Sequence, residues 1–377
     1  MAEKEKKRIL IATDCFAPRW DGIARFLHDV LPELTDMFEI TVIAPDFPGS
    51  YEQIDSIKII RIPLLKQFHF GDYTPAKREA RTIEKEVKKH DIVWVHTFSN
   101  IGLVASQMAK RHKKPYLVYV HSIDWMLVYK ALKTVFRKAL MHISKYFVLK
   151  RYQDAQLLMV PSLEVHEILR WNSIKTPMHV ISLGVDTDRF VRAVDKQKAK
   201  QRIGFSKDDK IIGYVGRLSR EKDVYTLYRA FLQVQKRIPN AKLLIVGDGT
   251  TELKSRFEKH ANIIHVGSQN DVLPYMQALD VHVLPSHLET TSLCTLEAMS
   301  CEVPVINTPV GLAKEYIKEK QNGFFFPKSN STVLALKLEW LLKEPLIQES
   351  IGKRARETVI KHYNLQKTIQ TLKTLLQ

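Results

Sequence analysis

The sequence predicts an α/β fold made of two Rossmann-like, doubly wound domains that face a common cleft. Short apolar runs alternate with helical patterns along the chain, which is typical of parallel sheets covered on both faces. The alternation starts afresh at residue 211, after a polar and charged stretch that begins near residue 186. A chain of 377 residues is long enough for two such domains, each with its own hydrophobic core.

In the first half of the chain, each apolar run of strand length is followed by a turn or a helical pattern. The turn at 18–22, which contains Pro18 and Gly22, separates the first strand from the first helix. We expect strands at 8–13, 40–44, 57–62, 92–95, 116–120, 156–160 and 179–182, and helices at 23–37, 75–89, 100–111 and 163–171.

The second half repeats the pattern. We expect strands at 211–215, 242–246, 263–266, 281–284, 303–307 and 323–326, with helices at 225–237 and 271–279, one ending near 260, and others starting near 292, 332 and 346. These elements predict an N-terminal acceptor-binding domain at 1–185 and a C-terminal nucleotide-binding domain at 186–360. The segment 361–377 is a C-terminal helix that can pack back on the N-terminal domain.

The stretch 125–152 interrupts the alternation with a basic helical pattern. Residues 125–153 contain seven Lys or Arg and no acid. Apolar residues recur at helical spacing and basic ones gather on another face. One interpretation is a core-facing helix with a solvated positive face, and the other is docking on anionic lipid headgroups. The apolar residues are Leu132, Phe136, Leu140, Ile143 and Phe147, the basic ones Lys130, Lys133, Arg137 and Lys145, and Trp125, Met126, Tyr129 and Tyr146 would suit an interface.

The amino-acid composition narrows the class of protein. The apolar share of 45% and charged share of 26% are those of a soluble globular protein, and no apolar run has the roughly 20 residues that span a bilayer. The first residues lack a signal-peptide core, so we expect a cytoplasmic protein, peripherally associated with the inner face of the membrane. The net charge of +17 predicts attraction to nucleic acid, anionic membranes or phosphorylated small molecules.

The three cysteines are Cys15, Cys294 and Cys301, and their number and spacing predict neither a disulfide framework nor a zinc site. We interpret them as buried thiols.

Two carboxylates stand eight positions apart in the segment 285–311. Glu289 lies in a turn, and Glu297 lies on a helix expected to start near Ser292. Because the N–H groups at a helix start have no intrahelical partner, a phosphate could lie between the two acids. The alternative is that both glutamates are solvated surface charges.

Two cations follow the strand at 211–215. Arg217 and Lys222 could both reach one pyrophosphate and neutralise a nucleoside-diphosphate leaving group without a metal. Gly22, which opens the first helix, would similarly let backbone N–H groups approach a phosphate. Each signal is weak alone, because basic loops are usually solvated and many strand-to-helix turns contain glycine.

Taken in order, these motifs resemble a family, the retaining glycosyltransferases of family 4 (glycosyl transferases group 1), which have the two-domain GT-B architecture. Within that family the chain resembles lipid-directed hexosyltransferases, and the resemblance covers nearly the whole chain. It is carried by the turn at 18–22, DIVWVHTFSNIGLVA (91–105), HSID (121–124), GVDTDRF (184–190), VGRLSREKD (215–223), IVGDG (245–249), and ALDVHVLPS (278–286) followed by E-x7-E.

The resemblance implies a role for each candidate residue. Arg217 and Lys222 look like the pyrophosphate cations, and Glu289 looks like the residue that contacts the donor sugar. His121 matches a histidine near the transferred sugar, although a packed histidine at a strand end is the alternative. The implied donor-binding residues are Gly22 over the diphosphate, Thr291, Ser292 and Leu293 at the phosphate, and Glu297 at the ribose.

The resemblance also implies retention of configuration, with the departing diphosphate taking the acceptor's proton, and no metal or other cofactor. Asp186 and Asp188 form a D-x-D pattern, but they belong to the motif GVDTDRF (184–190) at the linker between the domains, which we call the linker motif. We therefore interpret them as structural. Three positions depart from the family's pattern. The first loop has Asp21-Gly22-Ile23 where many members have paired glycines, Ser292 replaces a frequent glycine, and Glu302 falls where glycine is usual after the helix.

The expected function is therefore hexose transfer from a UDP-sugar or GDP-mannose to a lipid or lipid-linked acceptor at an anionic membrane surface. One alternative is transfer to a soluble sugar or sugar-phosphate acceptor. Another is a nucleotide-sugar epimerase, which would need no acceptor. A nucleic-acid-binding protein is prompted only by the net charge, and no recognised module accompanies it, so no nucleic-acid partner is expected.

Overall fold

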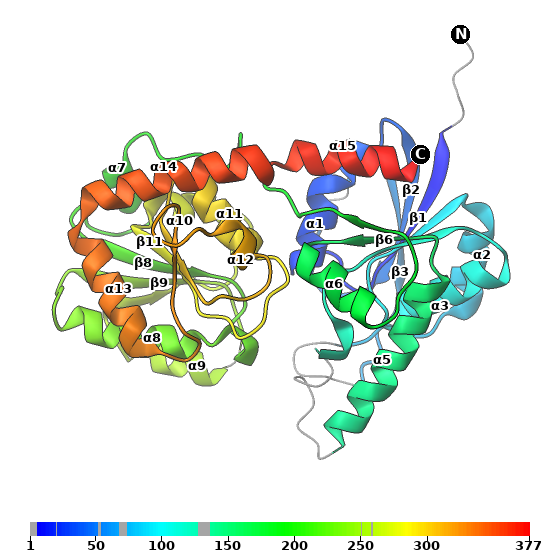
Figure 1. The fold of residues 1–377 in the computed structure, drawn as a ribbon, viewed down its shortest axis with the longest axis horizontal. Coiled ribbons are helices and arrows are strands. Elements are labelled where there is room, and N and C mark those ends of the chain that lie inside the picture. Colours follow the sequence, from blue (N-terminus) through cyan, green and yellow to red (C-terminus); the bar gives the residue numbers. More distant parts are fainter. Residues whose placement is uncertain are drawn as a thin grey trace, which may run out of the picture. The chain divides into compact units, whose positions relative to one another are not determined.

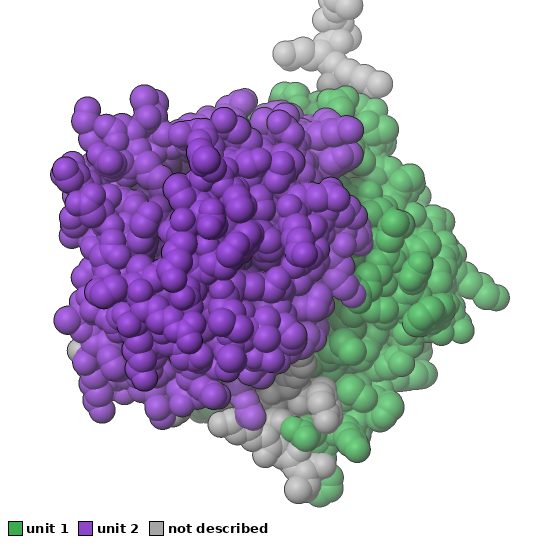
Figure 2. Space-filling model, turned by 60° about the vertical axis from the view of Figure 1, so that its left-hand side comes forward, with its two compact units in different colours: residues 1–183, 368–377 green, residues 184–367 purple. Residues whose placement is uncertain are grey.

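The computed structural model describes residues 6–19, 21–51, 54–67, 74–126, 136–249, 251–257 and 259–377. The chain forms two compact units, one made of residues 1–183 with 368–377 and the other of residues 184–367 (Figures 1 and 2). Each unit contains a parallel sheet with helices packed on it, which confirms the predicted α/β fold with two Rossmann-like domains.

The first unit is built on a seven-stranded parallel sheet in the order β3-β2-β1-β4-β5-β6-β7. The strand order reverses between β1 and β4, where Ile9 pairs with Ile40 on one side and with Ile92 on the other. In open sheets of this kind, ligands bind beyond the carboxyl ends of the strands at the reversal. The strands are β1 (Lys7–Ala12), β2 (Phe38–Pro45), β3 (Ile57–Ile62), β4 (Ile92–Val95), β5 (Tyr116–Tyr119), β6 (Leu157–Val160) and β7 (Met178–Val180).

Helices of the first unit follow the prediction with two shifts. The predicted helix 23–37 ends at Val30, because Pro32 has no N–H to continue the ladder and the chain passes into a 3₁₀ turn, Pro32–Leu34. The predicted helix 75–89 starts only at Ala80. Residues 368–377 join this unit, where Lys373 forms an ion pair of 2.7 Å with Asp36. The helices are α1 (Gly22–Val30), α2 (Ala80–Lys89), α3 (Asn100–Arg111), α5 (Arg137–Asp154), α6 (Leu163–Trp171) and α15 (Leu365–Leu376).

The second unit repeats the topology with a six-stranded parallel sheet in the order β10-β9-β8-β11-β12-β13, so its strand order reverses between β8 and β11. The strands are β8 (Lys210–Val215), β9 (Ala241–Val246), β10 (Ile263–His265), β11 (Val281–Leu284), β12 (Val305–Asn307) and β13 (Phe324–Phe325). The helices are α7 (Lys196–Arg202), α8 (Val224–Gln235), α9 (Thr251–Phe257), α10 (Leu273–Ala278), α11 (Leu293–Ser300), α12 (Ala313–Tyr316), α13 (Ser331–Lys343) and α14 (Pro345–His362).

Helix α7 lies in the polar stretch for which the sequence predicts no regular element. Asp195 caps it by accepting a hydrogen bond from the Lys198 N–H at 3.0 Å. Lys200 is buried, and its ammonium donates to the Asp280 carboxylate at 2.7 Å and to the Asp209 carbonyl at 2.6 Å. A charged residue therefore serves as a core residue here, which an apolar pattern does not reveal.

The linker motif forms a backbone junction within the second unit. The Val185 N–H donates to the Tyr363 carbonyl at 2.8 Å, and a Cβ on Gly184 would lie 2.6 Å from the Leu365 Cα. The Asp186 carboxylate accepts hydrogen bonds at 3.0 Å from the N–H groups of the next two turn residues, Asp188 and Arg189. In the structure, the first acid of the D-x-D pattern therefore caps a turn.

Helix α14 packs backbone to backbone against the end of α11. A Cβ on Gly352 would lie 2.0 Å from the Glu302 carbonyl oxygen. Glu302 has φ = 58°, the left-handed conformation that a residue just after a helix commonly adopts as glycine. The departure at Glu302 thus keeps the backbone conformation of a glycine, and the close contact fixes the end of the helix that carries Glu297.

We predict that Gly352→Ala destabilises the protein. In an ordinary helix interior, this change stabilises by about 1 kcal/mol. Here the new methyl group would overlap the Glu302 carbonyl, and overpacking of this kind typically costs about 1–3 kcal/mol. The free energy of unfolding, measured with denaturant, should therefore fall. Ser350→Ala, on the exposed side of the same helix, is the control, and a stabilised Gly352→Ala protein would contradict the packing.

Candidate functional site

Two loops at the carboxyl edge of the second sheet touch backbone to backbone. Gly216 directly follows β8, and Gly247 directly follows β9 with φ = 127°. A Cβ on Gly247 would lie 2.0 Å from the Gly216 carbonyl oxygen. Position 247 therefore has no room for a side chain. The contact holds the loop after β8 at the point where the strand order reverses.

That loop positions Arg217. The Tyr214 hydroxyl donates to the Arg217 carbonyl at 2.6 Å, and the Leu218 N–H donates to the Asp248 carbonyl at 2.8 Å. The Arg217 guanidinium lies 3.5 Å from the Glu221 carboxylate, and its side chain is 42% exposed. The backbone is therefore fixed while the charged group remains accessible to a ligand.

Lys222 and Glu289 meet in the structure. The Lys222 ammonium forms an ion pair with Glu289 Oε1, and the Ser286 hydroxyl donates to the same oxygen at 2.8 Å. The two side chains are 20% and 10% exposed. Sequence reasoning named both residues but not their contact, which joins the loop after β8 to the loop after β11.

The loop that carries Glu289 is braced from two sides. The His287 N–H donates to the Glu221 carbonyl at 2.7 Å, and the Leu312 N–H donates to the Thr290 carbonyl at 2.8 Å. Gly311 has φ = 53°, and a Cβ there would lie 2.3 Å from the Glu289 carbonyl oxygen. The sequence prediction gave Gly311 no role, because a single glycine after an apolar strand is an unspecific signal.

Helix α11 starts where the sequence predicts. Ser292 is its N-cap and accepts a hydrogen bond from the Thr295 N–H at 3.3 Å. The N–H groups of Leu293 and Cys294 come earlier in the first turn, where no intrahelical carbonyl is available. Thr291 precedes the cap. Glu297 lies about one turn further along and is buried.

In the first unit, His121 follows β5 and is buried beside His96, a residue that the sequence prediction did not name. His96 Nδ1 lies 2.9 Å from His121 Nε2. Burial lowers the pKa of His121 to about 3, so the ring is neutral near pH 7.

Gly22 opens α1, as expected, and no atom of the chain lies within 4 Å of a Cβ built there. The Asp21 carboxylate caps the helix and accepts hydrogen bonds from the Ile23 and Ala24 N–H groups at 2.9 and 3.0 Å. Two donors at this helix start are therefore already used by a side chain of the protein itself.

A buried aspartate at the end of β1 also escaped the sequence prediction. Asp14 accepts hydrogen bonds from the Ile101 N–H at 2.9 Å and from the Thr97 hydroxyl at 2.8 Å. Burial raises its pKa, and these hydrogen bonds oppose that shift. Asp14 thus ties the loop after β1 to the start of α3.

Helix α5 points its predicted apolar stripe away from the core. Val148 and Tyr152 are buried, whereas the stripe residues that the structure describes are 39–69% exposed. Trp125 is only 5% exposed, so the expectation that it lies at an interface is wrong. The described stripe consists of Phe136, Leu140, Ile143 and Phe147. Tyr129, Lys130, Leu132 and Lys133 lie outside the described residues.

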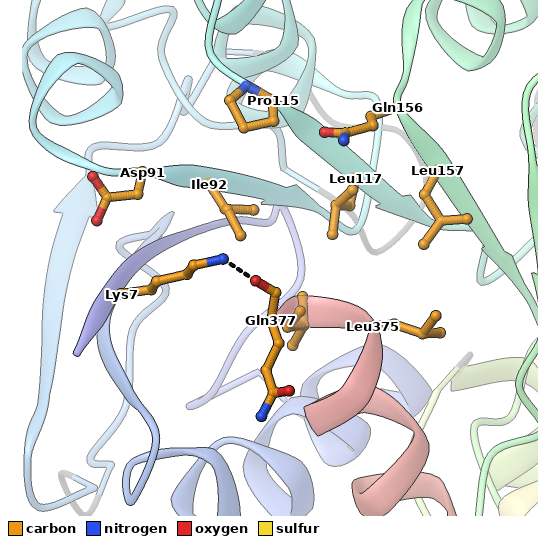
Figure 3. A pocket seen from close by; sticks show the side chains of 10 residues that line it. Lys7, Asp91, Ile92, Pro115, Leu117, Gln156, Leu157, Leu375 and Gln377 are labelled. Atoms are coloured by element: carbon orange, nitrogen blue, oxygen red, sulfur yellow. Dashed lines mark hydrogen bonds between the residues drawn. The ribbon is translucent and has the colours of Figure 1, made fainter. Parts of the chain in front are cut away.

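A cavity of about 500 Å³ lies at the opposite edge of the first sheet (Figure 3). Its lining comes from the amino ends of β1, β4, β5 and β6 and from the end of α15, and Lys7 donates a hydrogen bond to the Gln377 carbonyl beside it. Because ligands of such sheets bind beyond the carboxyl ends, this cavity is not the candidate site.

Among the described residues, no group of three His, Cys, Asp or Glu side chains is arranged to hold a metal ion. Within the same parts of the chain, no helix is both long and apolar enough to cross a bilayer. All three cysteines are free thiols, and Cys301 is buried.

Two solved structures share this architecture over nearly their whole length. Anabaena Alr3699/HepE in complex with UDP-glucose matches with a TM-score of 0.80 and 18% identity, covering 98% of this chain and 99% of that one. WaaG, a glycosyltransferase involved in lipopolysaccharide biosynthesis, matches with a TM-score of 0.78 and 16% identity, covering 98% and 99%. The fold is therefore that of the GT-B glycosyltransferases.

Each half of the chain matches a protein-family model. Residues 20–189 match the model described as Glycosyltransferase Family 4, and residues 195–358 match Glycosyl transferases group 1. The two models together span most of the chain, and the chain belongs to this family of glycosyltransferases.

Several characterised relatives are similar along much of their length. The alpha-monoglucosyldiacylglycerol synthase of Streptococcus pneumoniae is 26% identical, over 91% of this chain and 80% of its own. The GDP-mannose-dependent monoacylated alpha-(1-6)-phosphatidylinositol monomannoside mannosyltransferase of Corynebacterium glutamicum is 26% identical over 98% of both. The N-acetyl-alpha-D-glucosaminyl L-malate synthase of Bacillus anthracis is 29% identical over 56% of both.

We predict that acid destabilises the fold partly through buried neutral histidines. Burial lowers the pKa of His121 and of His282, a buried residue in β11, to about 3. Below pH 6.5 the unfolded chain binds protons that the folded chain does not, so stability falls as the pH drops from 6.5 toward 3. Each such histidine contributes about 1.4 kcal/mol per pH unit in that window.

The test compares the free energy of unfolding of the wild type and of His282→Met between pH 5 and pH 7.5. The free energy of unfolding of the variant should change less steeply with pH, by the contribution of one buried histidine. Replacing His166, a partly exposed histidine of α6, is the control. An unchanged slope in His282→Met would show that the native ring is protonated.

Proposed function

We propose that the protein transfers a glucose- or mannose-type hexose, with retention of configuration and without a metal, from a UDP-sugar or GDP-mannose to a lipid or lipid-linked acceptor at the membrane surface. The observation that carries the proposal is the cluster at the strand reversal of the second unit. There Arg217, Lys222 and Glu289 gather beside the start of α11.

The cluster suits a nucleotide-diphosphate sugar. Arg217 offers a planar fork of donors and Lys222 a compact charge, and together they would stabilise the negative charge that develops on the departing diphosphate. The backbone at Thr291, Ser292 and Leu293 would meet the phosphate at the start of α11. Glu289 would accept hydrogen bonds from the donor sugar.

Two residues complete the proposed set. Glu297 would hold the ribose of the nucleotide from inside α11. His121 is neutral near pH 7 because burial lowers its pKa, so it would hydrogen-bond to the transferred sugar rather than carry charge. Gly22 would lie over the diphosphate. The departing diphosphate would take the proton of the acceptor hydroxyl, so no carboxylate needs to act as base.

A lipid acceptor is supported by two relatives whose names specify glycolipid products or acceptors, and by helix α5. The exposed stripe of α5 recurs at i, i+4, i+7 and i+11, which places Phe136, Leu140, Ile143 and Phe147 on one face. The helix exposes Arg137, Lys138 and Lys150, and its single acid, Asp154, is paired with Lys110 at 2.7 Å. Apolar groups flanked by exposed cations fit an anionic membrane surface.

Transfer to a soluble acceptor is the second candidate. It is favoured by the similarity to the N-acetyl-alpha-D-glucosaminyl L-malate synthase, whose name specifies L-malate. That relative matches only 56% of this chain. The two candidates share the donor site and differ in whether α5 is needed for activity.

We predict that Arg217→Ala, Lys222→Ala and Glu289→Ala each lower kcat/KM for sugar transfer by at least about a hundredfold, the scale of removing a group that stabilises developing charge. The measurement follows radiolabelled sugar from the best donor of a panel of sugar nucleotides into extracted lipids. Consumption of the donor without any acceptor would instead indicate an epimerase.

Arg220→Ala is the matched control, because Arg220 is an exposed cation in the same loop. It should keep near-normal turnover. Near-normal turnover in all three site variants would show that the donor binds elsewhere.

We predict that the protein binds vesicles containing phosphatidylglycerol in a salt-dependent way. Ile143→Ser combined with Phe147→Ser should weaken binding by at least about tenfold, since each side chain contributes up to about 1.5–3 kcal/mol when fully buried. Replacing Lys130, Lys133, Arg137 and Lys145 by Glu should abolish it, because the charge attraction reverses.

The matched control is Leu163→Ser with Trp171→Ser, which removes two exposed apolar side chains from α6 of the same unit. Its vesicle binding should equal that of the wild type. Absent binding, or equal loss in both double variants, would exclude α5 as the docking element and favour the soluble acceptor.

A further inference from the structure

We propose that His96 is a positioning residue that holds His121 in one tautomer, with the proton on Nδ1, so that His121 acts as a hydrogen-bond donor in sugar transfer. The inference deepens the proposed function and rests on it for the role of His121. It starts from one contact, the 2.9 Å separation between His96 Nδ1 and His121 Nε2.

The contact requires one proton between two nitrogens. Burial lowers the pKa of both rings, so both are neutral near pH 7 and each carries a single N–H. Either His96 Nδ1–H donates to His121 Nε2, or His121 Nε2–H donates to His96 Nδ1. The first arrangement leaves the His121 proton on Nδ1, and the second leaves Nδ1 as an acceptor.

The far side of the His96 ring decides between them. His96 Nε2 is buried and has no hydrogen-bond partner among the described residues. In the second arrangement that atom would be a buried N–H without an acceptor, which is rare in proteins because the lost hydrogen bond with water is not replaced. In the first arrangement His96 Nε2 carries no proton, and a buried acceptor without a donor costs less than a buried N–H without an acceptor.

The indole of Trp94 adds to this preference. Its Nε1–H is always a donor, and it too is buried without a partner within the described part of the chain. The Trp94 and His96 ring centroids are 4.3 Å apart. In the second arrangement, both Trp94 Nε1–H and His96 Nε2–H would be buried without an acceptor on adjacent rings. In the first arrangement, only the Trp94 N–H is in that position.

The surrounding packing fixes the orientation of the pair. His96 stacks on Tyr119 with centroids 6.1 Å apart and an interplanar angle of 9°, and Phe26 contacts both histidines. The Tyr119 hydroxyl is directed elsewhere and donates to the Ile181 carbonyl at 2.6 Å. Within this cluster, the hydrogen bond at His121 Nε2 is made with His96 Nδ1.

For the reaction, the consequence is that His121 can act at Nδ1 only as a hydrogen-bond donor. With Nε2 occupied by the His96 N–H, the neutral ring presents Nδ1–H, and a sugar hydroxyl or ring oxygen would be met by a donor. The ring then cannot take a proton at Nε2 without breaking the His96 contact. This agrees with the proposal that the departing diphosphate accepts the acceptor's proton.

The test is ¹⁵N NMR of histidine side chains in the full-length protein, which distinguishes protonated from bare ring nitrogens without any substrate. In the wild type, His121 should carry its proton on Nδ1. In His96→Phe, which keeps a ring but removes the donor, His121 should shift toward the Nε2–H form that free imidazole side chains prefer in water. A wild-type His121 protonated on Nε2 would overturn the proposal.

Activity gives a second readout. His96→Phe should lower kcat by about ten- to a hundredfold, the range for removing a group that orients a site residue, with a smaller change in KM for the donor. Tyr119→Phe is the matched control, because it removes a hydrogen bond from the same cluster without touching the histidine nitrogens. It should leave the His121 tautomer and kcat near those of the wild type.

The outcomes separate the two proposals. If His121 has the predicted tautomer but the protein transfers no sugar, the proposed function fails and the histidine contact stands. If the protein transfers sugar and His96→Phe leaves both the tautomer and kcat unchanged, the positioning role fails alone. If Tyr119→Phe changes the tautomer as much as His96→Phe does, ring packing rather than the hydrogen bond sets it, which also overturns the proposal.

Discussion

The ion pair between Lys222 and Glu289 is the contact on which the proposed donor site depends. It joins the loops that follow β8 and β11, the two strands between which the order of the sheet reverses. Arg217 is likewise matched by Glu221, so the cations of the site are neutralised within the protein. A diphosphate bound as proposed would therefore have to exchange partners with these carboxylates. That exchange favours a ligand that brings both phosphate charge for the cations and hydroxyl donors for Glu289, which a nucleotide sugar does.

The two units use the same topology for different chemistry. In the second, the carboxyl edge carries opposed charges on loops fixed by glycine contacts such as that of Gly247 with Gly216. In the first, the edge carries buried groups, namely Asp14, which ties the loop after β1 to the start of α3, and the neutral pair His96 and His121. In the proposed site, the cations that would meet phosphate stay partly exposed, whereas the two histidines are buried, and burial keeps their rings neutral.

Local pattern was sufficient to predict most of the elements. Helices Asn100–Arg111 and Leu163–Trp171 start and end where the apolar period does. Helix α7 could not be predicted in this way, since Lys200 is buried only because Asp280, 80 positions away, receives its charge. The contact of His96 with His121 likewise joins residues that follow adjacent strands, β4 and β5, and a one-dimensional pattern does not show which side chains meet. The sequence predicted the apolar stripe of α5 but left its direction open, since apolar periodicity indicates a face but not what covers it.

The three departures from the family's glycine pattern have two different physical effects. At Glu302 the left-handed backbone is retained, with φ = 58°, and the neighbouring Gly352 supplies the close approach. At Asp21 and Ser292 a side chain of the protein caps the helix and uses N–H groups that a glycine would leave open. Fewer backbone donors then remain for a phosphate at either helix start. In the proposed reaction, the charge of the leaving group must therefore rest mainly on Arg217 and Lys222, which is consistent with their being held by loops that the sheet and its glycines make rigid.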